Sequence, residues 1–566
     1  MRLLALLAGL MAIFTSTLPA AALPEEGPGL SAVPPTRSAP ICDPVDELDD
    51  HCELWASYYD NEDGYLGGGT DAAEDIALSP DGELIFVVGQ TRHDPSNSDD
   101  ALAVAFRADD QSKLWVARYE GPAGRRDLAE HVAVSPDGST VFVAGVQDLS
   151  EDPENLEGDV LLVAYDAETG AERWSARYDG GRGIDLVTDM VLSPDGTRVY
   201  LSGGTFNGAV HATIDYDYLT LSFDAATGEQ RWVTTFDSQG VNGAFDFARG
   251  VSVSPDGRTL YVVGESSEQP GPGLPSTDFV TIAYVARDED EPDREGTQLW
   301  LARYNGRGDR GDLSKDNGSL VGISPDGERL YIGGQSACPL SEECWMSWAI
   351  LAYDTSSGQE LWRRRWMGFP QVRPTAYDLP TGLAVSPTGD RIFMTGWAVS
   401  LDGALAPYNY DMATVGFDAL SGEELWAGRY TVPGFQFSVG EDLAVSPDGR
   451  RVYTTGASYV SGFLTGVSGI IINNGGIVVY QPGIPGSVGN VATVAYDAGS
   501  GAQVWAARLN SSESDVDLSN GHAVAVAPDG SRVYTTGNIY PRLRASGPLP
   551  TEGANDRDVH VLGYAA

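Results

Sequence analysis

One four-residue turn recurs along the whole chain and constrains its fold more than any other feature. The turn reads Ser-Pro-Asp-Gly in six copies, and the two variants read Ser-Pro-Thr-Gly and Ala-Pro-Asp-Gly. In every copy a glycine stands ten residues after the first turn position. The copies begin at Ser79, Ser135, Ser193, Ser254, Ser324, Ser386, Ser446 and Ala527, so seven intervals average 64 residues. Self-similarity at a fixed spacing is the signature of a repeat architecture.

Each repeat contains four short runs rich in β-branched and aromatic residues, a composition that favours strands. The first run ends at the turn and the second follows it, as in residues 260–263. The third resembles residues 159–165, and the fourth begins at a tryptophan, as in residues 174–178. Proline and glycine suit the tight turn of a hairpin, and near-continuous apolar runs indicate burial on both faces. We therefore predict an all-β fold, a single eight-bladed β-propeller of four-stranded antiparallel blades.

The two ends of the chain predict how the ring closes. Residues 53–59 resemble a fourth strand, and residues 558–564 resemble a third strand. The N-terminal strand would complete the last blade and remove an exposed edge. A solenoid is the alternative architecture, but it would leave both strands unmatched.

The first residues predict export. A positive start, a short apolar run and Ala20-Ala21-Ala22 are typical of a signal peptide, here residues 1–22, cleaved after Ala22. Residues 23–41 are predicted to be a disordered leader, and residues 42–566 the propeller. We expect a secreted or periplasmic protein. Four cysteines fit an oxidising compartment, and their proximity in sequence predicts the disulfides Cys42–Cys52 and Cys338–Cys344.

Charge restricts the possible partners. The chain has 35 basic and 81 acidic residues, a formal charge of −46. Because phosphate binding depends on clustered Lys and Arg, we expect no nucleic-acid partner, and no later segment is long enough for membrane insertion. The expected partner is an extracellular ligand or protein whose identity the sequence does not reveal.

A motif between the third and fourth runs resembles a known family. Residues 164–174, Ala-Tyr-Asp-Ala-Glu-Thr-Gly-Ala-Glu-Arg-Trp, are similar to the tryptophan-docking motif of quinoprotein (PQQ-type) eight-bladed propellers. Close copies end at Trp232, Trp362, Trp426 and Trp505, and the Pro-Asp-Gly turns resemble YVTN-type propeller repeats. The resemblance implies that each indole packs between neighbouring blades.

The resemblance also raises the question of a quinone cofactor. The alcohol dehydrogenases of this family use a vicinal Cys-Cys pair beside the quinone, and this sequence has none. Their calcium and base carboxylates have no matching local motif here. We therefore consider PQQ and disfavour it, expecting no tightly bound quinone.

The candidate site lies at the ends of the strands opposite the repeated turns. There the links from second to third strands are long and dissimilar, and irregular loops on a rigid frame commonly carry binding. The residues that enter the first strands include a candidate Ca²⁺ set, Asp71, Asp75, Asp127, Asp185 and Asp189. His131 beside them is a candidate ligand-binding or acid–base group. The structural alternative is that these aspartates are repeated strand caps.

Two further features break the repeat. Trp345 and Trp397 could stack on a sugar or planar ligand, or simply pack in the interior. Residues 469–480 contain two apolar runs around Asn-Asn-Gly-Gly and predict an extra hairpin. It could serve a partner, act as a lid or pack over the channel.

No established catalytic motif occurs in the sequence, so catalytic residues are unknown. We expect an exported propeller that binds a ligand or protein through its loop-rich face, with Ca²⁺ as the candidate ion. The alternatives are a PQQ-dependent oxidoreductase and a Ca²⁺-dependent lyase or hydrolase.

Overall fold

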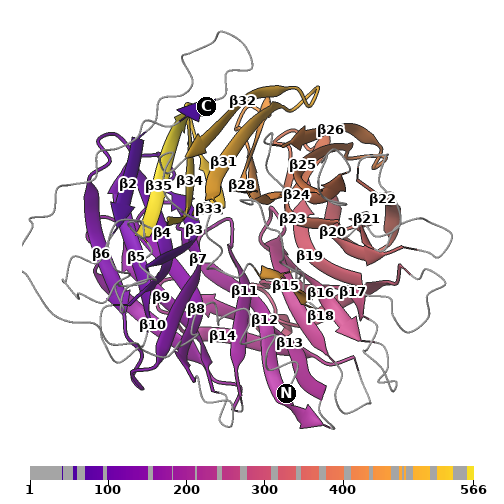
Figure 1. Cartoon of the computed structure of the whole chain (residues 1–566). Helices are drawn as coiled ribbons and strands as arrows, with labels where there is room; N and C mark the ends of the chain where they lie inside the picture. The colour runs from indigo at the N-terminus through magenta and orange to yellow at the C-terminus, as the bar shows by residue number, and fades with distance from the viewer. Residues whose placement is uncertain are drawn as a thin grey trace, which may run out of the picture.

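The structure, a computed structural model, is a ring of eight four-stranded antiparallel blades, as predicted (Figure 1). It describes residues 41–42, 55–59, 71–92, 99–150, 157–181, 183–210, 213–238, 245–267, 277–306, 316–338, 346–368, 378–400, 409–431, 437–460, 471–473, 477–479, 488–509, 519–539 and 558–566. The first strands of consecutive blades contact one another and surround the axis. Among the described residues, the single helical element is the short 3-10 turn η1 (Pro292–Arg294).

Each blade runs from its innermost to its outermost strand in chain order, except the last. Blades 1 to 4 consist of β3 (Ala72–Leu78), β4 (Leu84–Thr91), β5 (Asp100–Arg107) and β6 (Lys113–Tyr119); β7 (Arg126–Val134), β8 (Thr140–Leu149), β9 (Asp159–Asp166) and β10 (Glu172–Tyr178); β11 (Asp185–Leu192), β12 (Arg198–Val210), β13 (Thr213–Asp224) and β14 (Gln230–Phe236); and β15 (Asp246–Val253), β16 (Thr259–Ser267), β17 (Thr277–Val285) and β18 (Gln298–Tyr304). Blades 5 to 8 consist of β19 (Asp316–Ile323), β20 (Arg329–Ala337), β21 (Met346–Asp354) and β22 (Glu360–Trp366); β23 (Leu379–Val385), β24 (Arg391–Ser400), β25 (Asn409–Asp418) and β26 (Glu424–Tyr430); β27 (Phe437–Val445), β28 (Arg451–Val460), β31 (Val488–Asp497) and β32 (Gln503–Leu509); and β33 (Ser519–Val526), β34 (Arg532–Ile539), β35 (Asp558–Ala565) and β2 (Trp55–Tyr59).

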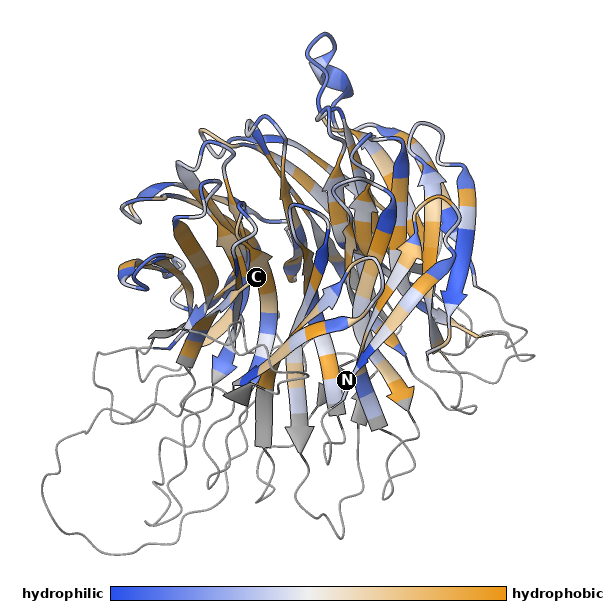
Figure 2. Ribbon diagram, turned by 90° about the horizontal axis from the view of Figure 1, so that it is seen from above, coloured by the Kyte–Doolittle hydropathy of each residue, from blue (hydrophilic) through white to orange (hydrophobic). Residues whose placement is uncertain are grey.

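The repeated turn joins the first two strands of each blade. In blade 2 the Gly138 N–H donates to the Ser135 carbonyl over 2.8 Å, and Gly138 has a φ of +73°. That backbone conformation favours glycine, which explains the invariant fourth turn position. Figure 2 shows hydrophobic residues along the strands and hydrophilic turns at one end of the propeller. We call this end the turn end and the opposite end the loop end.

The N-terminal strand closes the ring, as the sequence predicts. β2 pairs antiparallel with β35, with Trp55 opposite Gly563 and Tyr59 opposite Val559. Tyr59 is buried in a core cluster that also contains Val559 of blade 8 and Leu102 of blade 1. The first and last segments of the chain are therefore joined within one blade.

The tryptophans that open the fourth strands dock onto the next blade, which agrees with the resemblance. Trp115 Nε1 donates to the Ala167 carbonyl over 2.9 Å, and Trp300 Nε1 donates to the Thr355 carbonyl over 2.8 Å. Six of these indoles also lie against a glycine of the next blade; a Cβ on Gly170 would lie 2.6 Å from Trp115 Cδ2. The glycine contacts occur at Trp115, Trp174, Trp232, Trp300, Trp362 and Trp426 and are structural.

Three details add to the predicted fold. β1 (Ile41–Cys42) pairs with β32, so Ile41 belongs to a strand although we assign it to the leader. The predicted extra hairpin is present as β29 (Ile471–Asn473) and β30 (Ile477–Val479). The third strand of blade 3 is longer than the third strands of the other blades, since β13 starts four residues before Asp217.

Candidate functional site

Every innermost strand contains a β-bulge, and each bulge leaves one residue outside the strand register. We call the space inside the ring of innermost strands the channel. In β3, Ala73 is opposite Gly89 and Asp75 is opposite Val88, which leaves Glu74 as the extra residue. Glu74 is exposed and the other seven bulge residues are partly exposed, although the strands around them are largely buried. The eight bulge residues are Glu74, Glu130, Thr188, Arg249, Ser319, Thr381, Glu441 and His522.

The repeated glycine explains why the bulge recurs. Gly89 is opposite the residue before the bulge, and a Cβ on it would lie 1.8 Å from the Ala72 carbonyl oxygen. In blade 2 a Cβ on Gly145 would lie 1.9 Å from the Leu128 carbonyl oxygen. Because these contacts are with backbone, only glycine allows this approach. The bulge residue stands near the middle of each first strand, as Glu130 does in β7 and Glu441 in β27.

Three aspartates that follow bulge residues clamp neighbouring blades together. Asp75 accepts hydrogen bonds from the backbone N–H of Ile76 in its own strand, 2.8 Å, and of Val132 in the next blade, 2.9 Å. Asp189 does the same with Met190 and Val251, both at 2.8 Å. Asp442 repeats the arrangement between blades 7 and 8. Asp75 and Asp189 of the predicted Ca²⁺ set therefore border the channel.

The carboxyl groups of the channel have raised pKa values. Burial raises the pKa of Glu130 to about 8, and repulsion from Glu74 contributes. Burial likewise raises the pKa of Glu441 to about 7, with repulsion from Asp442. The pKa of Asp75 rises to about 7, mainly through burial, and charges in blades 3 and 7 add to it. The pKa values of Asp189 and Asp442 rise to about 6 for the same main reason.

The basic side chains near the bulges, Arg249, His131 and His522, do not neutralise these carboxyl groups. Arg249 is paired with Glu265 at 2.7 Å. Burial lowers the pKa of His131 to about 4, so it is neutral at pH 7. His522 Nε2 lies 2.9 Å from Asn520 Nδ2 and 3.0 Å from Asn538 Nδ2, which makes it a hydrogen-bond acceptor. The described channel is therefore an acidic environment.

The remaining predicted ligands, Asp71, Asp127 and Asp185, lie away from the channel residues. Each is buried at the entrance to its first strand. Asp127 accepts hydrogen bonds from the Gly121 and Asp148 N–H groups, and Asp185 accepts from the Gly180 N–H. The structure thus divides the predicted Ca²⁺ set into two groups, and Ca²⁺ binding by either stays a prediction.

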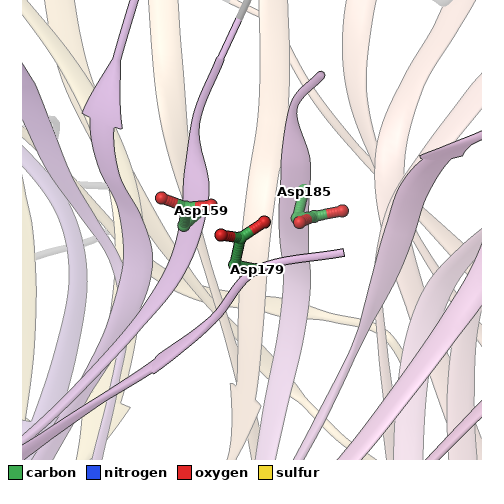
Figure 3. A group of neighbouring side chains, drawn as sticks. All are labelled: Asp159, Asp179 and Asp185. Atoms are coloured by element: carbon green, nitrogen blue, oxygen red, sulfur yellow. The ribbon is translucent and has the colours of Figure 1, made fainter. Parts of the chain in front are cut away.

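We call the loop-end position where the third and fourth strands of one blade meet the first strand of the next a junction corner. In the corner between blades 2 and 3, Asp159, Asp179 and Asp185 lie side by side (Figure 3). Arg177 binds Asp159 at 2.6 Å and Asp179 at 3.2 Å. The third-strand Asp278 and Asp411 likewise pair with fourth-strand arginines, Arg303 and Arg429.

The other predicted site residues have mixed placements. Trp397 is buried, with its ring centre 5.0 Å from that of Tyr410. Cys338 is buried and disulfide-bonded. The structure does not describe Trp345, Cys52, Cys344 or the side chain of Cys42, nor large parts of the links at the loop end. Both disulfide pairings therefore stay predictions.

Sequence analysis missed the bulge residues, above all Glu74, Glu130 and Glu441. The available signal was a repeated glycine together with one residue that broke the two-residue alternation of each first strand. That signal shows where a bulge lies only when the pairing register is known.

Comparison with known proteins supports the repeat type. Residues 99–269 match the PQQ-repeat family described as outer membrane protein assembly factor BamB, which is less than half of the chain. No curated protein matches the sequence. No helix among the described residues is long and apolar enough to cross a membrane.

Solved structures match the chain at low similarity. BamB from Moraxella catarrhalis is 12% identical, covers 83% of this chain and 94% of its own, and has a TM-score of 0.39. Sqt1 from Chaetomium thermophilum is 12% identical over 90% of this chain and all of its own, with a TM-score of 0.48. A europium-containing methanol dehydrogenase is 11% identical over 91% and 93%, with a TM-score of 0.43. Such distant likeness carries no functional argument. The chain is an eight-bladed β-propeller whose residues 99–269 are similar to the PQQ-repeat family described as outer membrane protein assembly factor BamB.

Proposed function

We propose that this protein is an exported binding scaffold that accepts a cationic group of a partner, a lysine or arginine side chain, into its channel from the loop end. The observation that carries the proposal is the acidic lining formed by Glu74, Glu130 and Glu441 with the clamp aspartates. Carboxyl groups with pKa values of about 6 to 8 hold protons mainly because burial disfavours their charged forms, and repulsion between neighbouring carboxylates adds to this effect. An entering cation would replace those protons and relieve the repulsion.

The long links at the loop end support a partner-binding role in this proposal, because variable loops around an acidic opening provide room for recognition. The net charge of −46 would steer a basic partner toward the protein over long distances. Export is inferred from the predicted signal peptide. A Ca²⁺-dependent lyase or hydrolase stays an alternative prediction.

The described channel does not fit PQQ. PQQ is an anion with three carboxylates, and the channel lining is itself acidic. Its one arginine, Arg249, is already paired with Glu265. We therefore derive no quinone chemistry for this chain.

Fluorescence anisotropy with a fluorescein-labelled tetralysine peptide tests the proposal. The variant Glu74→Gln/Glu130→Gln/Glu441→Gln should bind at least about tenfold more weakly than wild type, since three attractive charges near the cation are lost. The matched control, Glu83→Gln/Glu168→Gln/Glu229→Gln, removes three exposed charges at the turn end.

The control variant should bind within about twofold of wild type, because distant exposed charges are screened by salt. Equal loss of binding in both triple variants would show that only net charge matters and would contradict the proposal. So would absence of peptide binding by the wild type at low ionic strength.

A further inference from the structure

Two arginines on the outermost strand of blade 5 depart from the repeat. They are Arg363 and Arg364, which directly follow the docking residue Trp362 in β22. In β21 they stand opposite Leu351 and Ile350. No other blade carries a charged residue at either equivalent position. The equivalent pairs are Val116 and Ala117, Ser175 and Ala176, Val233 and Thr234, Leu301 and Ala302, Ala427 and Gly428, Ala506 and Ala507, and Ala56 and Ser57.

The two guanidinium groups are exposed on opposite faces of the strand. The Arg363 guanidinium carbon lies 5.8 Å from the ring centre of Tyr304 in blade 4, and the Arg363 side chain is 61% exposed. Because successive side chains of a strand point to opposite faces, Arg364 points away from blade 4. Arg363 Nε lies 3.6 Å from Glu360 Oε1. Arg364 Nη1 donates to the Arg363 carbonyl at 2.9 Å, and no carboxylate among the described residues pairs with it.

The backbone of this strand is open on one side. β22 lies at the outer rim of the ring, and within the described part of the chain it pairs only with β21 (Figure 1). An edge strand of this kind presents N–H and C=O groups that can pair with an added strand. Blade 7 shows such an addition, because β1 pairs with the outer strand β32, with Ile41 opposite Arg508 and Cys42 opposite Ala507. Ala507 is 2% exposed there, whereas Arg364 at the same position is exposed. The outer edge of a blade therefore accepts an extended segment.

Charged side chains on an edge strand can also protect it against unwanted pairing. Protection does not explain why the charges occur in blade 5 alone. Val116, Val233 and Leu301 occupy the Arg363 position in other blades, where they are 37%, 40% and 37% exposed with no charge beside them at the next position. These apolar edges would need protection more than blade 5 does. Recognition of a segment of opposite charge explains both the position and the sign of the two residues.

We propose that the free edge of β22 docks an extended acidic segment of a partner protein, which pairs with the strand backbone and sets carboxylates against Arg363 and Arg364. In this binding mode main-chain hydrogen bonds supply affinity and side chains supply specificity. Because the two arginines point to opposite faces, the segment needs acidic residues at adjacent positions. Leu361 and Met367, 47% and 53% exposed, flank the arginines and offer contacts to apolar residues beside that acidic pair. The inference is independent of the channel, which is proposed to accept a cation.

Fluorescence anisotropy with the full chain and a fluorescein-labelled peptide, Thr-Val-Thr-Asp-Asp-Thr-Val-Thr, tests this edge. The salt concentration is about 0.15 M, where the Debye length of about 8 Å screens the repulsion between the peptide and distant acidic residues. Arg363→Gln/Arg364→Gln should weaken binding at least about tenfold, because both attractive charges are lost. Its melting temperature should equal that of wild type, since both side chains are exposed. The matched control, Arg258→Gln/Arg450→Gln, removes two exposed arginines at the turn end and should bind within about twofold of wild type.

Two further peptides separate strand pairing from charge attraction. Proline in place of the two threonines beside the aspartates removes backbone donors and should weaken binding at least about tenfold. Asparagine in place of both aspartates should weaken it to a similar extent.

The inference is overturned if wild type binds the acidic peptide with a Kd above about 1 mM. It is also overturned if the proline peptide binds as tightly as the parent peptide, or if Arg363→Gln/Arg364→Gln binds as tightly as wild type. Sedimentation equilibrium covers the remaining occupant. Self-association of wild type that is lost in Arg363→Gln/Arg364→Gln would show that the edge pairs with a second copy of this chain, and would likewise overturn the inference.

Discussion

Replacing Tyr59 by alanine perturbs the closure of the ring at one side chain. Tyr59 ends β2 and is 2% exposed within the core between blades 8 and 1. Its hydroxyl accepts a hydrogen bond from Arg118 Nη2 at 2.8 Å, and Lys113 Nζ lies 5.3 Å from the ring centre. The side chain therefore joins the N-terminal strand to blade 1 and to the strands of blade 8 at the other end of the sequence.

The expected cost follows from this burial. An aromatic side chain buries about 200 Å², which at about 25 cal/mol per Å² contributes about 5 kcal/mol. Large-to-small core substitutions of this kind cost about 3–5 kcal/mol. Tyr59→Phe removes only the hydroxyl and its hydrogen bond, and should cost about 0.5–1.5 kcal/mol. The difference between the two variants isolates the packing contribution.

Urea unfolding followed by tryptophan fluorescence measures both variants. Tyr304→Ala is the matched control, because Tyr304 ends the fourth strand of blade 4 within the ring and is 5% exposed. If β2 closes the ring, Tyr59→Ala and Tyr304→Ala should lower the free energy of unfolding by similar amounts. A loss below about 0.5 kcal/mol for Tyr59→Ala, beside a full loss for Tyr304→Ala, would refute the closure.

Three further predictions test the channel, the turns and the disulfides. The pKa of Glu130 in the folded protein is about 8, above its ordinary value of 4.5, so stability should fall as pH rises through this window. The free energy of unfolding of Glu130→Gln should equal that of wild type near pH 4.5 and exceed it by about 1–3 kcal/mol at pH 8.5. Free energies of unfolding that vary with pH in the same way in both proteins would contradict this prediction. Gly170→Ala should lower the free energy of unfolding by about 1–3 kcal/mol more than Gly257→Ala, because both glycines have positive φ but only the Gly170 Cβ would collide with Trp115. Equal losses in urea unfolding would show that backbone strain alone matters. Non-reducing peptide mapping should recover the linked pairs Cys42–Cys52 and Cys338–Cys344.

The blades could be predicted from sequence because their signals are local. The turn proline and glycine, the third-strand apolar run and the docking tryptophan each act within a few residues of where they stand. Ring closure was also predictable, because the sequence begins with a fourth strand that lacks its own blade and ends with a third strand that lacks a fourth. These two strands complete one blade when they pair. The arginine–aspartate pairs were not, although both residues are visible in the sequence. Their contact depends on a cross-strand register that joins residues 18 positions apart, as in Asp159 and Arg177.

The bulge explains why the predicted aspartate cluster divides in two. Asp185 and Asp189 are four residues apart, and in a regular strand an even separation would place both side chains on one face. The register advances by one residue between Val187 and Asp189, so the two aspartates leave the strand on different faces. Asp185 turns into the junction corner, while Asp189 clamps the next blade beside the channel.

The same bulge sets one residue of each first strand apart from the residues that pair across the strands. The extra residue is not part of the cross-strand ladder, so its side chain can change without altering the pairs on either side. The eight bulge positions indeed differ in charge and size, with Glu74, Arg249 and His522 among them, whereas the glycine opposite each bulge is invariant. In a ring of nearly identical blades, specificity depends on residues that depart from the repeat. The acidic bulge residues Glu74, Glu130 and Glu441 do so outside the cross-strand ladder, so their substitution should change binding before it changes blade packing. Thr188 and Thr381 differ from them, because each donates a hydrogen bond to a backbone carbonyl of the next blade.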